Sequence, residues 1–274
     1  MYSADGHSTF SSNQVATLRI LFASLALLPF GIRAFKALDF RKDILPFSIV
    51  AICGNLAPAF LFTYAETGIS SGLAGMLNSI TPIFTILIAI FIFKDKMSYR
   101  QVVGTAIGFI GVGLLLYFGK QNSIEGEWSH IISVLGATLC YAISLSVIRY
   151  KLSHYKSLDI AAIAFLLLLL PSLVLFFTED TLNTFQNNIQ IWNSLSAILI
   201  LSIVGTALAL FIFNTIIKNT SALFASSVTY FIPIVAVVFG FFFNEVITAL
   251  QITGMLIALL GVFIANSNRR QKSS

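Results

Sequence analysis

Residues 70–82 read SSGLAGMLNSITP, and residues 221–233 read SALFASSVTYFIP, 151 positions later. Both stretches start with serine and end with a proline inside a hydrophobic span. Five hydrophobic spans separate each copy from its partner, so we expect the second copy to be inverted across a membrane. Inverted repeats are typical of secondary transporters, because two halves of opposite orientation give outward-open and inward-open states of similar energy. Further matches, at spacings of 151 and then 150, are Gly54 with Gly205, Gln101 with Gln251, Gly104 with Gly254, and Gly111 with Gly261.

The composition predicts an all-α polytopic membrane protein. Hydrophobic residues make up 57% of the chain and charged residues 10%, whereas soluble domains carry about 25% charged residues. Apolar runs of about 20 residues recur, each long enough to cross the hydrocarbon core as a helix. The alternating pattern of membrane β-strands is absent. We expect nine spans, at residues 15–34, 45–65, 70–93, 101–118, 130–148, 160–177, 194–216, 222–243 and 248–266.

The positive charges predict how these spans are oriented. When the 16 lysines and arginines are assigned to alternate sides of the nine spans, Arg19 and Lys120 alone fall on one side. The positive-inside rule makes the opposite side cytoplasmic. This orientation places the C-terminus in the cytoplasm and favours the plasma (inner) membrane. Trp128 and Trp192 both precede spans on the outer side, where amphipathic rings favour the headgroup layer.

The repeat divides the chain into a first half, residues 1–120, and a second half, residues 121–274. The second half contains five predicted spans and the first half contains four. The missing partner is therefore the first helix of the first half, which would precede Met1. Two interpretations stay open: Met1 is an internal methionine of a ten-helix protein, or the protein has nine spans.

Pro82 and Pro233 predict two kinked helices, because each proline removes a backbone hydrogen bond inside a span. The freed carbonyls must face protein or water, since lipid cannot satisfy them. Paired kinked helices with polar groups near mid-depth indicate a substrate-binding cavity, although side chains that only bond neighbouring helices fit the same pattern. The polar residues beside the prolines are Asn78 and Ser79 in one copy, with Thr229 and Tyr230 at the equivalent positions. Further candidates for the cavity wall are Asn55, Tyr64, Tyr141 and Asn214.

Arg19 and Glu66 lie near the outer ends of their spans. An arginine at a helix centre costs about 2.5–3.5 kcal/mol on insertion scales, and much less near an end, where it can snorkel. Two interpretations stay open for the two charges. They are solvated at the interface, or they form an ion pair that closes the outer mouth and for which a substrate carboxylate competes. No Asp or Glu lies in the middle of a predicted span.

Two short motifs at equivalent positions predict helix starts. Residues 98–101 (SYRQ) and 248–251 (TALQ) match the capping box, in which the hydroxyl and the Gln side chain each satisfy a backbone N–H. Asp95 and Glu245 precede them, near the positive end of a helix dipole. We read these carboxylates as structural, and a mobile gate carboxylate is the alternative.

One predicted span carries a face of small residues that its repeat partner echoes. The residues are Gly104, Gly108, Gly111 and Gly113, echoed by Gly254, Ala258 and Gly261. Small residues let helices approach closely. We expect this packing within the chain, and a homodimer is the alternative.

Residues 64–82 (YAETGISSGLAGMLNSITP) and 95–104 (DKMSYRQVVG) together resemble the third-to-fourth helix region of EamA-type permeases, in the drug/metabolite transporter superfamily. The second copy of the acidic motif, residues 245–254, reads EVITALQITG. This chain departs from the family in having Asp95 where Glu is usual and in lacking the first helix. The resemblance implies ten helices in two inverted five-helix halves around a central cavity. Such proteins move amino acids, nucleobases, sugar phosphates or drugs.

No sequence motif points to an enzyme, a metal site or a bound cofactor. A P-loop, a dinucleotide fingerprint, a zincin motif and a nucleophile elbow are all absent from the sequence. We therefore expect a secondary transporter of small organic solutes such as amino acids, an exporter by the resemblance. Its partners would be a small-molecule substrate and the lipid bilayer, not nucleic acid. The alternative is a non-transporting or partner-dependent membrane component truncated at its N-terminus.

Overall fold

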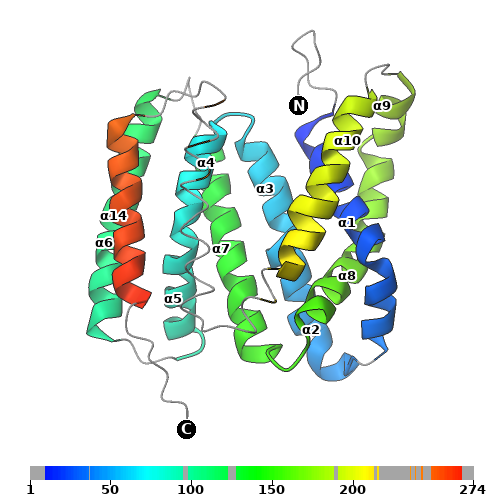
Figure 1. The fold of residues 1–274 in the computed structure, drawn as a ribbon, viewed down its shortest axis with the longest axis horizontal. Helices are drawn as coiled ribbons and strands as arrows, with labels where there is room; N and C mark the ends of the chain where they lie inside the picture. Colours follow the sequence, from blue (N-terminus) through cyan, green and yellow to red (C-terminus); the bar gives the residue numbers. More distant parts are fainter. Residues whose placement is uncertain are drawn as a thin grey trace. The chain divides into compact units, whose positions relative to one another are not determined.

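The computed structural model describes residues 10–36, 38–94, 98–122, 128–187, 191–212, 215, 235, 238, 242 and 248–266. These residues form helices joined by short turns, and no strand occurs among them (Figure 1). The all-α class is confirmed for this part of the chain.

The chain forms two compact units, and each unit draws on both ends of the sequence. The first unit comprises Met1–Tyr64 and Val147–Lys218, and the second comprises Ala65–Ser146 and Asn219–Ser274. Each unit therefore contains residues from both predicted repeat halves. The two units show which helices pack together. The division into halves 1–120 and 121–274 rests on the sequence repeat and stays a prediction.

The first unit is built around the long helix α1, which packs along α8. Gly31 lies so close to α8 that a Cβ there would be 2.8 Å from the Ala162 carbonyl oxygen. Thr17 and Ser24 share this face of α1, because residues seven apart lie two turns apart on one side of a helix. The helices of this unit are α1 (Ser12–Phe35), α2 (Phe40–Ala51), η1 (Ile52–Leu56), α3 (Ala57–Ala65, up to Tyr64), α8 (Ser157–Thr178), α9 (Thr181–Asn187), α10 (Ile191–Ser202) and η3 (Ile203–Leu208).

The second unit contains the helical stretch around Pro82, which a 3₁₀ turn interrupts, and the two glycine-rich helices. Its helices are α4 (Ser71–Leu77), η2 (Asn78–Ile80), α5 (Thr81–Phe91), α6 (Tyr99–Asn122), α7 (Trp128–Lys151, up to Ser146) and α14 (Ala249–Asn266). Both predicted capping boxes are confirmed at the starts of α6 and α14. The N–H of Ser98 donates to Gln101 Oε1 at 2.8 Å, and the N–H of Thr248 donates to Gln251 Oε1 at 2.8 Å. Asp95 and Glu245 lie outside the described residues.

Helices α6 and α14 lie side by side with their glycine faces in contact (Figure 1). A Cβ on Gly104 would lie 2.5 Å from the Gly261 carbonyl oxygen, and a Cβ on Gly111 would lie 2.7 Å from that of Gly254. These contacts make the two helices antiparallel. Gly104 lies against Gly261, which is the repeat equivalent of Gly111. Gly111 lies against Gly254, which is the repeat equivalent of Gly104. The prediction that this face packs within the chain is confirmed for Gly104, Gly108 and Gly111, whereas Gly113 is exposed and takes no part in the contact.

Six helical stretches in the described residues are long and apolar enough to cross a membrane. They correspond to six of the nine predicted spans. Helices α6 and α14 occupy two further predicted positions, and most of the predicted span 222–243 lies outside the described residues. The six stretches are Ser12–Phe35, Phe40–Ala65, Ser71–Phe91, Trp128–Lys151, Ser157–Thr178 and Ile191–Ile212.

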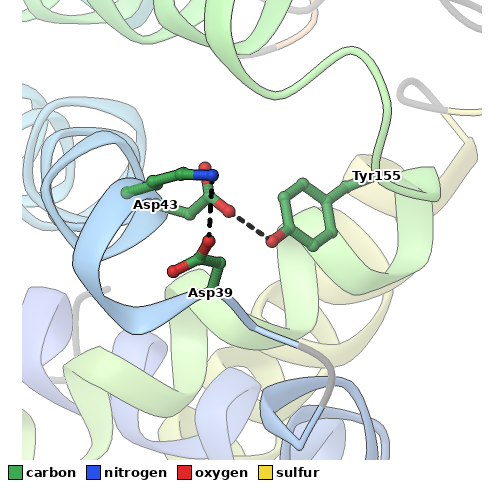
Figure 2. A network of polar contacts seen from close by, with 4 residues as sticks. Asp39, Asp43 and Tyr155 are labelled. Carbon is green, nitrogen blue, oxygen red and sulfur yellow. Dashed lines mark hydrogen bonds and ion pairs between the residues drawn. The ribbon is translucent and has the colours of Figure 1, made fainter.

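Tyr155, in the turn between α7 and α8, contacts the first turns of α2 through a hydrogen bond and a ring contact (Figure 2). The Tyr155 hydroxyl donates to Asp43 Oδ2 at 2.6 Å, and its ring packs edge-on against Phe47 with centroids 5.1 Å apart. Partial burial raises the pKa of Tyr155 above its ordinary value, and the hydrogen bond to Asp43 raises this pKa further. The neighbouring ion pair between Lys42 and Asp39, at 3.5 Å, is exposed, and such pairs contribute little to stability.

We expect Tyr155→Phe to lower the free energy of unfolding by about 1 kcal/mol, the net value of one hydrogen bond, while keeping the Phe47 contact. Because the folded-state pKa is raised, the contribution of the hydroxyl is present below the ordinary Tyr value of 10.0. It is lost as the pH rises through the folded-state pKa. Thermal unfolding of the detergent-solubilised protein across pH tests this. The control is Tyr99→Phe, at an 83% exposed tyrosine; equal losses in both variants would contradict the prediction.

Candidate functional site

Two π-helical turns interrupt two of the spans at equivalent places in the repeat. η1 lies inside the stretch Phe40–Ala65, and η3 lies inside Ile191–Ile212. Their first residues, Ile52 and Ile203, are 151 positions apart. In each turn a backbone N–H reaches back five residues, from Ala57 to Ile52 and from Ala209 to Val204. π-Helical turns are rare in proteins, and those that do occur are often found at functional sites.

A polar side chain satisfies a backbone carbonyl beside each π-helical turn. Asn55 Nδ2 donates to the Val50 carbonyl oxygen at 3.2 Å, and the Thr206 hydroxyl donates to that of Leu201 at 3.0 Å. Both pairs are five residues apart, and both partners match at the spacing of 151. The sequence aligned the preceding glycines, Gly54 and Gly205, but Thr206 was not predicted as a site residue. The available signal was a polar residue directly after the aligned glycine in both copies.

Arg19 meets the second π-helical turn within the first unit. Its Nε donates to the Thr206 hydroxyl oxygen at 2.9 Å, and its side chain is half-buried. The guanidinium belongs to the eighth residue of α1, about two turns from the start of a stretch that is long and apolar enough to span a membrane. Glu66, its predicted partner, is exposed and belongs to the second unit. The ion pair between Arg19 and Glu66 stays a prediction.

Asn78 lies at a 3₁₀ turn just before Pro82, and its side-chain donor is unused among the described residues. Because Pro82 has no N–H, the Asn78 carbonyl accepts from Thr81 instead, and the chain tightens into the 3₁₀ turn η2. The Thr81 hydroxyl donates to Asn78 Oδ1 at 3.2 Å. Within the described part of the chain the Asn78 Nδ2 group has no partner. Ser79 differs: its side chain is buried and its hydroxyl donates to the Met76 carbonyl at 2.7 Å.

The other predicted cavity residues are distributed over both units. Tyr64 is 40% exposed near the end of α3 in the first unit, and Tyr141 is half-buried on α7 in the second. The cavity that these residues were expected to line stays a prediction. The predicted residues Asn214, Thr229, Tyr230 and Pro233 lie outside the described residues.

Two buried hydroxyls on α1 were not predicted from the sequence. Thr17 Oγ1 and Ser24 Oγ are buried and have no hydrogen-bond partner among the described residues. They share one face of α1 with Gly31, which packs on α8. An unpaired hydroxyl inside a helix interface carries a cost, and small Ser and Thr side chains in such interfaces let membrane helices approach closely. We read these two residues as part of that packing.

The chain is similar to known transporters along nearly its whole length. The profile of the EamA-like transporter family matches residues 2–117 and 128–267. The "Probable terminal-alkyne amino-acid exporter" of Streptantibioticus cattleyicolor is 25% identical, over 93% of this chain and 85% of that protein. The "Uncharacterized transporter YcxC" of Bacillus subtilis is 24% identical, over 94% of this chain and 81% of that protein.

A solved crystal structure shares this fold at low sequence identity. It superposes with a TM-score of 0.58 over 93% of this chain and 89% of the other chain, at 15% identity. At this identity the similarity concerns the fold alone.

Proposed function

Because the chain belongs to the EamA-like transporter family, we propose that it exports amino acids or similar small organic solutes by alternating access. It is an integral membrane protein by family and by its apolar helices. The observation that carries the mechanism is the pair of π-helical turns, η1 and η3, at equivalent positions of the repeat. The choice of amino acids is supported by the name of the relative from Streptantibioticus cattleyicolor.

In this proposal the two π-helical turns are the hinges of the transport cycle. A π-helical turn contains one residue more than an α-turn, so its hydrogen bonds can shift by one residue while the rest of the helix stays intact. The side chains of Asn55 and Thr206 keep a carbonyl satisfied beside each turn, which lipid could not do. Two equivalent hinges in copies of opposite direction would give the two open states similar energies. The antiparallel contact of α6 with α14 supports this inversion.

Substrate binding is assigned to the kinked helix at Pro82 and to its repeat partner at Pro233. Asn78 supports this assignment, because this residue is half-buried and its Nδ2 group donates no hydrogen bond to any described residue. In a dry site such a donor favours a ligand carbonyl or carboxylate. We place the protein in the plasma membrane in this proposal, and the distribution of Lys and Arg supports a cytoplasmic C-terminus.

The test is efflux from cells that express the full chain and are preloaded with labelled L-amino acids, L-propargylglycine included. We expect faster efflux than in cells with empty vector. Asn78→Ala should lower the efflux rate roughly tenfold, because a hydrogen bond within a membrane protein contributes about 1–2 kcal/mol and about 1.4 kcal/mol equals a factor of ten. Thr85→Val is the matched control, since the Thr85 hydroxyl donates to the Thr81 carbonyl of its own helix.

Each part of the proposal has its own contradicting outcome. Unchanged efflux in Asn78→Ala would remove this residue from the site and leave the transporter in place. Efflux of nucleobases or sugar phosphates in place of amino acids would change the substrate class. If the full chain moves no solute of any of these classes, a membrane component that works only with a partner becomes the better interpretation.

A further inference from the structure

We propose that Arg19 is the binding site for a carboxylate of the transported solute, held at the second hinge of the proposed transporter. This inference rests on the proposed function and names the chemical class of its substrate. Three properties of Arg19 carry it: its place in an apolar helix, the absence of a carboxylate paired with it among the described residues of the first unit, and a hydrogen bond that orients its guanidinium.

Arg19 lies about two turns from the start of α1, and its half-buried side chain has apolar neighbours. It belongs to Ser12–Phe35, a stretch apolar enough to span a membrane, and its neighbours Val15 and Phe22 pack against an apolar cluster with Leu18. Arginine keeps its proton in proteins, so the site carries a permanent positive charge. Charged residues inside membrane segments are rare and mark substrate or ion pathways.

Within the first unit, no described acidic side chain forms an ion pair with Arg19. The ion pair between Lys42 and Asp39 lies at the start of α2 and does not involve Arg19. Glu179 meets the same end of α1, but its Oε1 accepts from Asn13 Nδ2 at 3.4 Å. Its backbone carbonyl accepts from Gln14. A carboxylate lies beside α1, therefore, and is bonded to Asn13 rather than to Arg19.

Among the described residues Arg19 has one hydrogen bond, which orients the guanidinium and leaves its two terminal NH2 groups available. Nε donates to the Thr206 hydroxyl oxygen at 2.9 Å. The proton of that hydroxyl is already committed to the Leu201 carbonyl, so Thr206 can only accept from Arg19. The terminal NH2 groups make no hydrogen bond to any described residue. This planar fork matches the two oxygens of a carboxylate.

The same hydrogen bond couples binding to movement. Thr206 belongs to η3, and its hydroxyl bonds both Arg19 and the Leu201 carbonyl beside this turn. An anion that moves the Arg19 side chain would therefore also affect the hydrogen bond at the π-helical turn. A ligand changes a conformational equilibrium only when it binds the two states unequally. If the hydrogen bonds of η3 shift by one residue and the bond from Arg19 to Thr206 is lost, the guanidinium loses its orientation in that state. The anion would then bind the two states with unequal affinity.

The oxyanion that Arg19 recognises is a carboxylate in this proposal, but a lipid phosphate offers the same chemistry. The test therefore uses the full chain in nanodiscs of phosphatidylcholine and, in parallel, of phosphatidylglycerol. The probes are L-propargylglycine, L-leucine and 4-methylpentanoate, each compared with its matching amide at constant ionic strength. The readout is the probe concentration that gives half of the maximal rise in unfolding temperature, which requires no transport.

We expect the acids to stabilise the wild type at concentrations at least tenfold lower than their amides. Arg19→Gln should abolish this preference, and Arg19→Lys should keep part of it, since an ammonium retains the charge but not the fork. The matched control is Arg33→Gln, at an exposed arginine on the same helix. This control should leave the preference for the acid unchanged.

The outcomes separate the site from the proposed function. If no acid stabilises the wild type, or if Arg19→Gln keeps the preference for the acid, the site is overturned, whatever the efflux assay shows. If phosphatidylglycerol replaces the effect of the acids in an Arg19-dependent way, the site binds lipid and the proposal is also overturned. Arg19-dependent binding of an acid without efflux would support the site and contradict the transporter.

Discussion

Replacing Gly111 or Gly261 by alanine should destabilise the chain by about 1–3 kcal/mol, the usual cost of overpacking, whereas Gly113→Ala should change little. A Cβ on Gly111 would lie 2.3 Å from the backbone nitrogen of Ala258, and one on Gly261 would lie 2.3 Å from that of Gly108. Backbone atoms cannot rotate out of the way as a side chain can. Helices α6 and α14 would have to separate, and the contacts along their whole interface would weaken.

Gly113 is the matched control, because it lies on the same helix, is exposed, and has no atom within 4 Å of an added Cβ. Gly108→Ala should fall between the two, since its Cβ would meet the flexible end of Ile83. The measurement is unfolding in mixed micelles of increasing denaturing detergent. Equal stability of all four variants would show that α6 and α14 are not packed this closely.

The size of the two losses also bears on the repeat. Gly111 and Gly261 are equivalent at the spacing of 150, and each approaches the backbone of the partner helix at an equivalent place. A pseudo-two-fold axis through this interface would make the losses similar. A loss in one variant alone would speak against that axis.

The features predicted well from the sequence are those with a local physical cause. A capping box needs only a hydroxyl and a Gln three residues apart, and both boxes formed as expected. The glycine face was visible because residues three or four apart share one side of a helix. Hydrophobic length alone located six of the spans, since the bilayer fixes how many apolar residues a crossing helix needs.

The π-helical turns could not be predicted in this way. Their residues, ICGNL and IVGTAL, contain no proline, although Pro58 follows the first turn closely, and the glycine followed by a polar residue in each is not specific to a π-turn. A π-turn depends on one additional residue that the surrounding packing must accommodate, which is a property of the bundle and not of the segment. Arg19 shows the same limit: the sequence did not indicate its hydrogen bond to the Thr206 hydroxyl, 187 residues away.

Removing the polar side chains of the two π-helical turns should impair transport unequally. Asn55→Ala leaves the Val50 carbonyl without its side-chain donor and disturbs nothing else that the described structure assigns to Asn55. Thr206→Val removes the donor to Leu201 and also the acceptor of Arg19. We expect a several-fold lower efflux rate for Asn55→Ala. For Thr206→Val we expect a loss of roughly 10- to 100-fold, because hydrogen bonds to charged groups contribute about 1.5–3 kcal/mol.

The unequal losses distinguish a hinge from a mere anchor for Arg19. Thr253→Val is the control, because that exposed threonine hydroxyl also bonds a carbonyl of its own helix but outside a π-turn. If Asn55→Ala transports like the wild type while Thr206→Val does not, Thr206 acts only by orienting Arg19, and η1 is not a hinge. If Asn55→Ala and Thr206→Val both lower the efflux rate and Thr253→Val does not, the polar side chain of the π-turn is needed for transport in both copies of the repeat. That result requires the two copies to move by one mechanism, since Asn55 and Thr206 share no bonding partner and correspond to each other only through the repeat.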